Sequence, residues 1–409
     1  MPFFHCALLF TLSVSQFLPL AFCVMALPTI LLVQGVPLEQ LSLIYLVGVV
    51  WVIKFLWAPY IDRISFGRFG HYKPWLLISQ TLLVGTTILF ILVGDVTNFH
   101  LMLVLATIMS VFASMQDIAV DAVACRLIPE NQRGLGSAIQ FSGNLVSTIL
   151  GGGVVLVLYE HIGWQSCLWV ITAAVAAVIV IIMWFDERDI ELAKDIEVNR
   201  PSFSRLFSFW VQPQMGIWAV LLILLPMSIT IVWSLASPIL INRDWAPGEI
   251  GILLHIVAPI IGVVVTFGFG YLLNNFDKWL VIASVPILQA VAIFSLYHFI
   301  DLQLSMYGIM IALLLVYCLD IGLFVILNAF KLEYSGAGTE GTDFTVQNSL
   351  HGLAAFSAAA AALYFAEKIG FSNLILIAIC LSIFSGLFLY GTIIFKPANT
   401  KKQSSNLGT

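Results

Sequence analysis

Two carboxylates lie inside an apolar part of the sequence. Asp117 and Asp121 are four residues apart within the run 101–125, whose other residues are almost all apolar. This spacing places both side chains on one face of a helix. A charged side chain at the centre of a membrane-spanning helix costs about 2.5–3.5 kcal/mol on insertion scales. The pair therefore indicates a polar interior and chemistry based on proton uptake and release.

A third charge of the same kind is Lys54, within the apolar stretch 41–60. At the helical rise per residue, Lys54 and Asp117 both lie roughly 12–14 Å inside the end of their helices. We therefore expect Lys54, Asp117 and Asp121 to form one titrating cluster that couples to protons. The structural alternative is a permanent ion pair that only holds the helices together.

Composition indicates an integral membrane protein. Of the 409 residues, 61% are hydrophobic and only 10% are charged, against about 25% charged in soluble domains. The apolar runs are nearly continuous, which favours helices over the alternating strands of a β-barrel. The six cysteines are scattered singly and lack metal-ligand spacing, so we expect small apolar packers and no metal site, cofactor or catalytic residue.

Twelve apolar runs are long enough to cross a bilayer at about 20 residues each. They cover residues 6–33, 39–60, 75–94, 100–126, 135–159, 165–185, 214–240, 249–274, 279–300, 306–332, 345–365 and 372–394. The longest polar stretch follows the sixth run and divides the chain into similar halves. The sequence thus predicts an all-α membrane protein with six-helix bundles at 1–186 and 214–396, a linker at 187–213 and a tail at 397–409.

The positions of Lys and Arg predict the orientation. Most of the 17 fall in one set of alternate connections: Arg63, Arg68, Lys73, Arg126, Arg133, Arg188, Lys194, Arg200, Arg205, Lys278, Lys331, Lys396, Lys401 and Lys402. By the positive-inside rule these connections, the linker and both termini are cytoplasmic.

The two halves contain matching segments. Residues 160–164 (EHIGW) return as 367–371 (EKIGF), and residues 134–140 (GLGSAIQ) align with 341–347 (GTDFTVQ) at the same interval. A duplicated six-helix unit with parallel repeats predicts a substrate site at the midplane between the halves. Gln140 and Gln347 occupy equivalent repeat positions, so we expect both to line that site.

Two further residues are candidates for substrate contact. Trp51 has a ring that could stack on an aromatic ligand, although tryptophan more commonly faces lipid or the membrane interface. Asp320 stands alone in an apolar run, where substrate contact and a buried pair with a neighbouring helix are equally compatible with the sequence.

The loop 58–75 (APYIDRISFGRFGHYKPW) resembles the loop between spans two and three of the major facilitator superfamily. The resemblance implies a conformational latch formed by Asp62, Arg63 and Arg68. In one conformation only, Asp62 would face the N-terminus of span eleven near Gly341 and Thr342, where an anion gains about 0.3–1 kcal/mol. The alternative is an ordinary positive-inside loop.

Further motifs are similar to the AmpG-like branch of this superfamily, which includes muropeptide permeases, acetyl-CoA transporters and RhtX/FptX siderophore permeases. The matching segments are 54–59 (KFLWAP), 62–63 (DR), 74–77 (PWLL), Gln80, 116–121 (QDIAVD), 129–130 (PE), 133–134 (RG) and 161–164 (HIGW). Segments 26–28 (ALP) and 341–347 look most like the siderophore group. One departure is 67–73, where relatives carry a denser arginine cluster.

The resemblance implies a proton-coupled permease of the bacterial inner membrane that imports a siderophore, with its iron, by alternating access. Import of a muropeptide is the alternative within the same class. Expected partners are a small-molecule substrate, protons and the lipid bilayer, with no nucleic acid, and the protein is expected to be a monomer. Two rivals from other classes are a membrane-embedded enzyme, which the dispersed histidines disfavour, and a ligand sensor, which would need an output domain.

Overall fold

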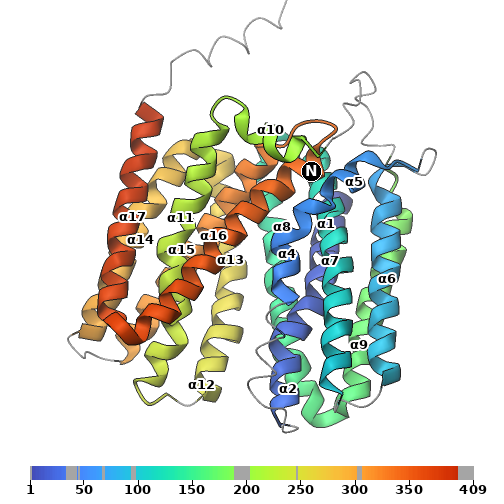
Figure 1. The fold of residues 1–409 in the computed structure, drawn as a ribbon, viewed down its shortest axis with the longest axis horizontal. Coiled ribbons are helices and arrows are strands. Elements are labelled where there is room, and N and C mark those ends of the chain that lie inside the picture. The colour runs from blue at the N-terminus through green and yellow to red at the C-terminus, as the bar shows by residue number, and fades with distance from the viewer. Residues whose placement is uncertain are drawn as a thin grey trace, which may run out of the picture.

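A computed structural model of the chain describes residues 2–33, 44, 47–66, 70–93, 98–187, 203–245, 247–301 and 306–394. Over these residues the chain is helical and contains no strand. Figure 1 shows two groups of helices side by side, one holding α1 to α9 and the other α10 to α17. The chain therefore has the two-bundle membrane fold that its apolar runs predict.

Most of the first group is built from long helices because few polar residues interrupt its apolar runs; α2, α4 and α5 are short. Its helices are α1 (Phe3–Ala21), α2 (Leu27–Val33), α4 (Val49–Ile53), α5 (Ala58–Arg63), α6 (Tyr72–Val93), α7 (Phe99–Leu127), α8 (Arg133–Thr148) and α9 (Val155–Trp184). Two π-helical segments, Phe22–Ala26 and Ile149–Val154, join α1 to α2 and α8 to α9.

The second group begins with a short helix at the end that also carries the chain's N-terminus (Figure 1). Its helices are α10 (Arg205–Val211), α11 (Met215–Ile241), α12 (Pro247–Ile252), α13 (Ala258–Asn275), α14 (Lys278–Asp301), α15 (Met306–Tyr334), α16 (Glu340–Ile369) and α17 (Phe371–Ile394). A π-helical segment, Leu253–Val257, joins α12 to α13.

Eleven helices in the described part are long and apolar enough to cross a membrane. The predicted span 39–60 is not among them, and its residues 39–43 and 45–46 lie outside the described part. The rest of that span forms α4 and the start of α5, separated by the 3-10 turn Lys54–Leu56. Pro59 lies in the first turn of α5, where its missing N–H group costs no hydrogen bond within the helix. Lys54 thus lies at a break in the helix.

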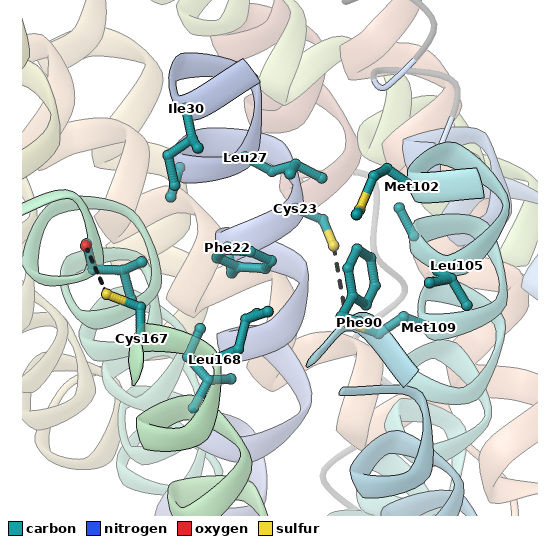
Figure 2. Packing of buried hydrophobic residues seen from close by; sticks show 14 of the residues in the cluster. Phe22, Cys23, Leu27, Ile30, Phe90, Met102, Leu105, Met109, Cys167 and Leu168 are labelled. Atoms are coloured by element: carbon teal, nitrogen blue, oxygen red, sulfur yellow. Dashed lines mark hydrogen bonds between the residues drawn. The ribbon is translucent and has the colours of Figure 1, made fainter. Parts of the chain in front are cut away.

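Aliphatic side chains, together with several aromatic and sulfur-containing ones, form one core cluster of the first group (Figure 2). The rings of Phe22 and Phe90 meet edge to face, with centroids 6.2 Å apart. The sulfur atoms of Cys23 and Met109 are 3.9 Å apart. Cys23 and Cys167 are buried and form no disulfide, as expected for small apolar packers.

The matched repeat segments adopt the same backbone turn. Gly163 separates the two membrane-crossing parts of α9 with φ 75°, and Gly370 separates α16 from α17 with φ 81°. Positive φ values of this kind favour glycine over residues with a Cβ atom. Each group therefore reverses direction between its fifth and sixth crossing at an equivalent glycine.

Glu187, at the start of the predicted linker, is not solvated. Only 3% of it is exposed, and its carboxylate accepts hydrogen bonds from the backbone N–H groups of His71, Tyr72 and Lys73. Glu187 therefore satisfies the first donors of α6, which have no partner within the helix.

The two groups meet most closely where α8 crosses α13. A Cβ atom on Gly134 would lie 2.7 Å from the carbonyl oxygen of Gly270. A Cβ atom on Gly270 would lie 2.9 Å from the carbonyl oxygen of Gly134. The mutual absence of side chains lets the two backbones touch, as small residues do in membrane helix pairs.

Candidate functional site

A cavity of about 480 Å³ lies between the two groups. Helices of both groups line it with aromatic rings and uncharged amides around a few charges. The polar lining residues are Ser13, Gln16, Lys54, Asp117, Asp121, Gln140, Asn144, Thr148, Asn328, Asn348 and His351. The aromatic lining residues are Phe17, Trp51, Phe141, Phe324 and Phe356.

The three predicted charges lie together on one wall of this cavity. Lys54 forms an ion pair with Oδ2 of Asp117, and the two side chains are 3% and 6% exposed. Gln16 donates a hydrogen bond of 2.8 Å to the other oxygen, Oδ1. Both oxygens of Asp117 are therefore satisfied, and its negative charge is matched by Lys54.

The carboxylate of Asp121 has fewer hydrogen-bond partners than that of Asp117. Its Oδ1 accepts a hydrogen bond of 3.3 Å from Nε2 of Gln140, while its Oδ2 is buried without a hydrogen-bond partner in the described part of the chain. A buried carboxylate oxygen without a donor costs free energy. Asp121 is therefore the less completely satisfied of the two carboxylates.

Gln140 also connects Asp121 to the second group. Its Oε1 accepts a hydrogen bond of 3.4 Å from Nδ2 of Asn328 on α15. Beside this contact, the rings of Phe141 and Phe324 stack across the same interface with centroids 4.2 Å apart. One amide pair and one ring pair thus connect the two groups beside the cavity, where α8 faces α15.

Of the residues predicted to contact the substrate, some line the cavity and others do not. Trp51 lines the cavity, with its ring centroid 4.8 Å from that of Phe17 and 5.1 Å from the ammonium of Lys54. Gln140 lines it as expected, whereas Asp320 does not.

Gln347 was wrongly expected in the cavity. It is fully buried against α11, where its Oε1 accepts a hydrogen bond from the indole N–H of Trp218. Its Nε2 donates to the backbone carbonyl of Asp343, 2.9 Å away. The repeat relation to Gln140 therefore does not give the two glutamines the same surroundings.

Sequence reasoning missed two polar residues of the second group. Lys331 was assigned to a loop, but it lies within α15 with 1% of its surface exposed. His351 was considered only as one of several scattered histidines, yet it lines the cavity. The Nζ of Lys331 lies 2.9 Å from Nδ1 of His351.

Asp62 makes the contact that the loop resemblance implies. Its carboxylate accepts hydrogen bonds from the backbone N–H groups of Gly341, at 3.2 Å, and Thr342, at 2.6 Å. The hydroxyl of Tyr72 donates a third hydrogen bond at 2.8 Å. These donors belong to the first turn of α16 and the start of α6, so Asp62 joins the two groups at one end of the molecule, here called the closed end.

Two ion pairs hold the same turn of α16. Arg126 at the end of α7 pairs with Glu340 at 3.0 Å, and its guanidinium lies 4.7 Å from the ring centroid of Tyr72. Arg205 at the start of α10 pairs with Asp343 at 2.6 Å.

The two arginines assigned to the latch are not placed in these contacts. Arg63 is exposed, and Arg68 lies outside the described residues. Of the predicted latch, the structure thus shows the carboxylate contact, and the role of the arginines stays a prediction.

The sequence profile of the Major Facilitator Superfamily matches residues 9–359. This match covers most of the 409 residues, so the chain belongs to the Major Facilitator Superfamily. The chain is accordingly a multi-pass membrane protein of a transporter family, and the AmpG-like resemblance of its motifs agrees with its relatives.

The chain is 27% identical over 263 residues to an anhydromuropeptide permease of Escherichia coli K12, covering 63% of this chain. It is 24% identical over 296 residues to a transporter named AmpG 4 of Rickettsia conorii, covering 68% of this chain and 70% of that protein. The chain spans about half of the Escherichia coli permease, 54% of its length.

Solved structures support the fold. The crystal structure of the E. coli fucose:proton symporter FucP is similar with a TM-score of 0.72 at 15% identity, covering 95% of this chain and 98% of FucP. A bacterial homologue of the iron transporter ferroportin, in an outward-facing state, is similar with a TM-score of 0.71 at 15% identity, covering 94% of this chain and 98% of that chain. At these identities the similarity concerns the fold alone.

Proposed function

We propose that this protein is a proton-coupled permease that imports muropeptide-type cell-wall fragments across the bacterial inner membrane by alternating access. In this proposal the six-helix bundles 1–186 and 214–396 tilt against each other around the cavity. The closed end faces the cytoplasm, because Arg63, Arg126 and Lys278 lie there and positive residues mark cytoplasmic connections.

Two arguments favour a cell-wall fragment over a siderophore. The relatives that this chain resembles include an anhydromuropeptide permease. The segments that suggested siderophores, 26–28 and 341–347, do not line the cavity. Gly341 and Thr342 instead hold Asp62 at the closed end, so these segments carry no information on the substrate. A cavity with many amides and aromatic rings suits a solute made of amino sugars and a short peptide.

The observation that carries proton coupling is the unsatisfied Oδ2 of Asp121 beside the Lys54–Asp117 pair. Protonation of Asp121 removes one negative charge from the cluster and weakens its hydrogen bond from Gln140. Because Gln140 also accepts from Asn328 in the other group, the change reaches the interface between the bundles. The two states of a transporter need such a differential interaction to exchange under a proton gradient.

The test is transport by protein reconstituted in liposomes. Wild-type protein should accumulate a labelled anhydromuropeptide when an inward proton gradient is imposed. The Asp121→Asn variant should exchange labelled for unlabelled solute yet lose uphill accumulation, because asparagine cannot release a proton. A ferric siderophore serves as the competing substrate.

Full accumulation by Asp121→Asn would overturn the assignment of the proton site. Accumulation of the siderophore without any flux of the muropeptide would overturn the substrate and restore the siderophore hypothesis.

A further inference from the structure

Lys331 is a buried lysine that forms no direct ion pair with a carboxylate in the described part of the chain. It lies near the end of α15 with 1% of its surface exposed. The ion pairs of the described residues join Lys54 with Asp117, Arg126 with Glu340, Arg205 with Asp343 and Lys278 with Glu333. A buried charge without a partner is costly and marks a functional position in a membrane protein.

The neighbours of this ammonium face the substrate cavity. Nζ of Lys331 donates to Oδ1 of Asn348 at 2.6 Å, and it lies 2.9 Å from Nδ1 of His351 and 5.6 Å from the ring centroid of Phe324. Asn348, His351 and Phe324 all line the cavity. An ammonium has three N–H donors, and these two acceptors, both uncharged when His351 is neutral, use only two of them.

We propose that Lys331, with Asn348 and His351, forms the site in the second bundle that binds a carboxylate group of the transported solute. The inference deepens the proposed function, on which it rests. A carboxylate placed against Asn348 and His351 supplies both an acceptor for the third N–H donor and a negative charge in direct contact with the ammonium. Charge-assisted hydrogen bonds of this kind are among the stronger polar contacts in proteins.

The arrangement of charges supports an anion at this place. The acidic residues of the cavity, Asp117 and Asp121, belong to α7 in the first bundle, whereas Lys331 belongs to the second. A solute carboxylate at Lys331 therefore lies on the bundle that does not carry these acids. The solute would then contact both bundles, with its anionic end on α15 and α16 and its uncharged part along Gln16 and Asn144.

The experiment measures binding to purified protein in lipid nanodiscs with two matched probes. One is an anhydromuropeptide with free peptide carboxyl groups, and the other is the same compound with those groups converted to primary amides. Wild-type protein should bind the acid about 10- to 100-fold more tightly than the amide, the range expected for one charge-assisted hydrogen bond. The Lys331→Gln variant should bind both probes with the weaker affinity, and Lys331→Arg should keep the preference.

Lys278→Gln is the matched control. Lys278 is a half-exposed lysine whose ion-pair partner, Glu333, lies two positions after Lys331 in the sequence. It should keep the wild-type preference for the acid. Equal affinity of wild-type protein for acid and amide overturns the carboxylate site, whether or not Lys331→Gln folds. An equal loss of both probes in Lys331→Gln also overturns it, because that result describes a purely structural lysine. Failure of wild-type protein to bind either probe refutes the proposed substrate class itself.

Discussion

Asp117 and Asp121 share a helix face but have different surroundings. Asp117 is matched by Lys54 and receives a second hydrogen bond from Gln16, so both of its carboxylate oxygens have partners. Asp121 has only the longer bond from Gln140 and one oxygen without a donor. The spacing in the sequence gives the two carboxylates equal weight, and the neighbours on α1, α8 and the Lys54 turn distinguish them.

The Lys54–Asp117 pair should matter for stability as well as transport. The Lys54→Met variant leaves a buried aspartate without its counter-ion, which typically costs about 3–5 kcal/mol. We expect a clearly lower unfolding temperature in detergent for Lys54→Met. The double variant Lys54→Met/Asp117→Leu should recover most of that loss while transport stays impaired.

This prediction separates the two explanations of the ion pair. Recovery of both stability and transport in the double variant would show that the pair only holds the helices together. An unchanged unfolding temperature in Lys54→Met would contradict the burial of an ionised Asp117.

Residue type and neighbourhood explain which site residues were predictable. Lys54, Asp117 and Asp121 stood out because each interrupts an apolar run. Lys331 was missed because it lies near the end of its run, two residues from Glu333, where a lysine resembles an interface anchor. Gln347 was misplaced because equivalence in a repeat fixes backbone position but not which neighbouring helix a side chain meets.

At the scale of elements, the first turn of α16 is the point where the two bundles are tied. Asp62 of α5 and Arg126 of α7 reach this turn from the first bundle. Arg205 of α10, in the same bundle as α16, pairs with Asp343 in the turn. The backbone N–H groups at a helix N-terminus have no partner within the helix and favour anions. The tie therefore uses a property of every helix end, and the family resemblance of the loop sequence was sufficient to predict the Asp62 contact.

Removing the carboxylate of Asp62 should weaken the closed end. The Asp62→Ala variant leaves the N–H groups of Gly341 and Thr342 and the hydroxyl of Tyr72 without this acceptor, at about 1–3 kcal/mol for each buried donor. We expect the open state to gain at least about tenfold in population. The measurement is the distance between spin labels at Asn131 and Asn275, which are exposed residues of opposite bundles at this end.

An unchanged label distance distribution in Asp62→Ala would contradict the latch. Substitution of the exposed residue Ser65, just after α5, by alanine provides the comparison for changes in this loop itself.

The same carboxylate predicts a pH dependence. Burial raises the pKa of Asp62 to about 6 in the closed state, although hydrogen bonds from Thr342 and Tyr72 oppose the rise. Opening hydrates the group, and its pKa falls toward about 3.9. The state with the higher pKa binds the proton more tightly, so the closed state gains stability as pH falls from about 6 to about 4.

Between pH 7.5 and pH 5 the ratio of closed to open molecules should therefore rise about tenfold, as the same label pair reports. In Asp62→Asn this part of the pH dependence should vanish, since the amide does not titrate. A shift of equal size in wild-type protein and Asp62→Asn would assign the effect to another group.

At the scale of the whole molecule, the crossing of α8 and α13 sets how closely the bundles approach. A Cβ atom on Gly134 would lie 2.5 Å from the Cβ atom of Leu273 and 2.7 Å from the carbonyl oxygen of Gly270. Such overpacking costs about 1–3 kcal/mol, and only the state in which the bundles touch here bears that cost.

Gly134→Ala should therefore shift the protein toward its open state and slow the return step of transport. Gly268→Ala is the matched control, because a Cβ atom on Gly268 of α13 would meet nothing within 4 Å. Equal label distances in Gly134→Ala and wild-type protein would show that the helix crossing accommodates the added methyl group. The equilibrium between the open and closed states would then be unchanged.

Most of the architecture followed from the apolar runs, because a membrane-spanning helix must satisfy its backbone hydrogen bonds internally. The repeated segments around Gly163 and Gly370 also fell between predicted spans, although their shared backbone turn was not predicted. The break at Lys54 and the burial of Glu187 did not, because both depend on partners distant in the sequence. Glu187 contacts α6 through residues more than a hundred positions earlier.

The distribution of polar residues around the cavity has a consequence for how such permeases diversify. The three residues that we propose to couple to protons, Lys54, Asp117 and Asp121, belong to the first bundle. Asn328, Lys331, Asn348 and His351 belong to the second. Replacement of an amide or a base on α15 or α16 can therefore alter which solute is accepted while the energy source stays intact. Related permeases can in this way differ in substrate specificity while they keep the same residues for proton coupling.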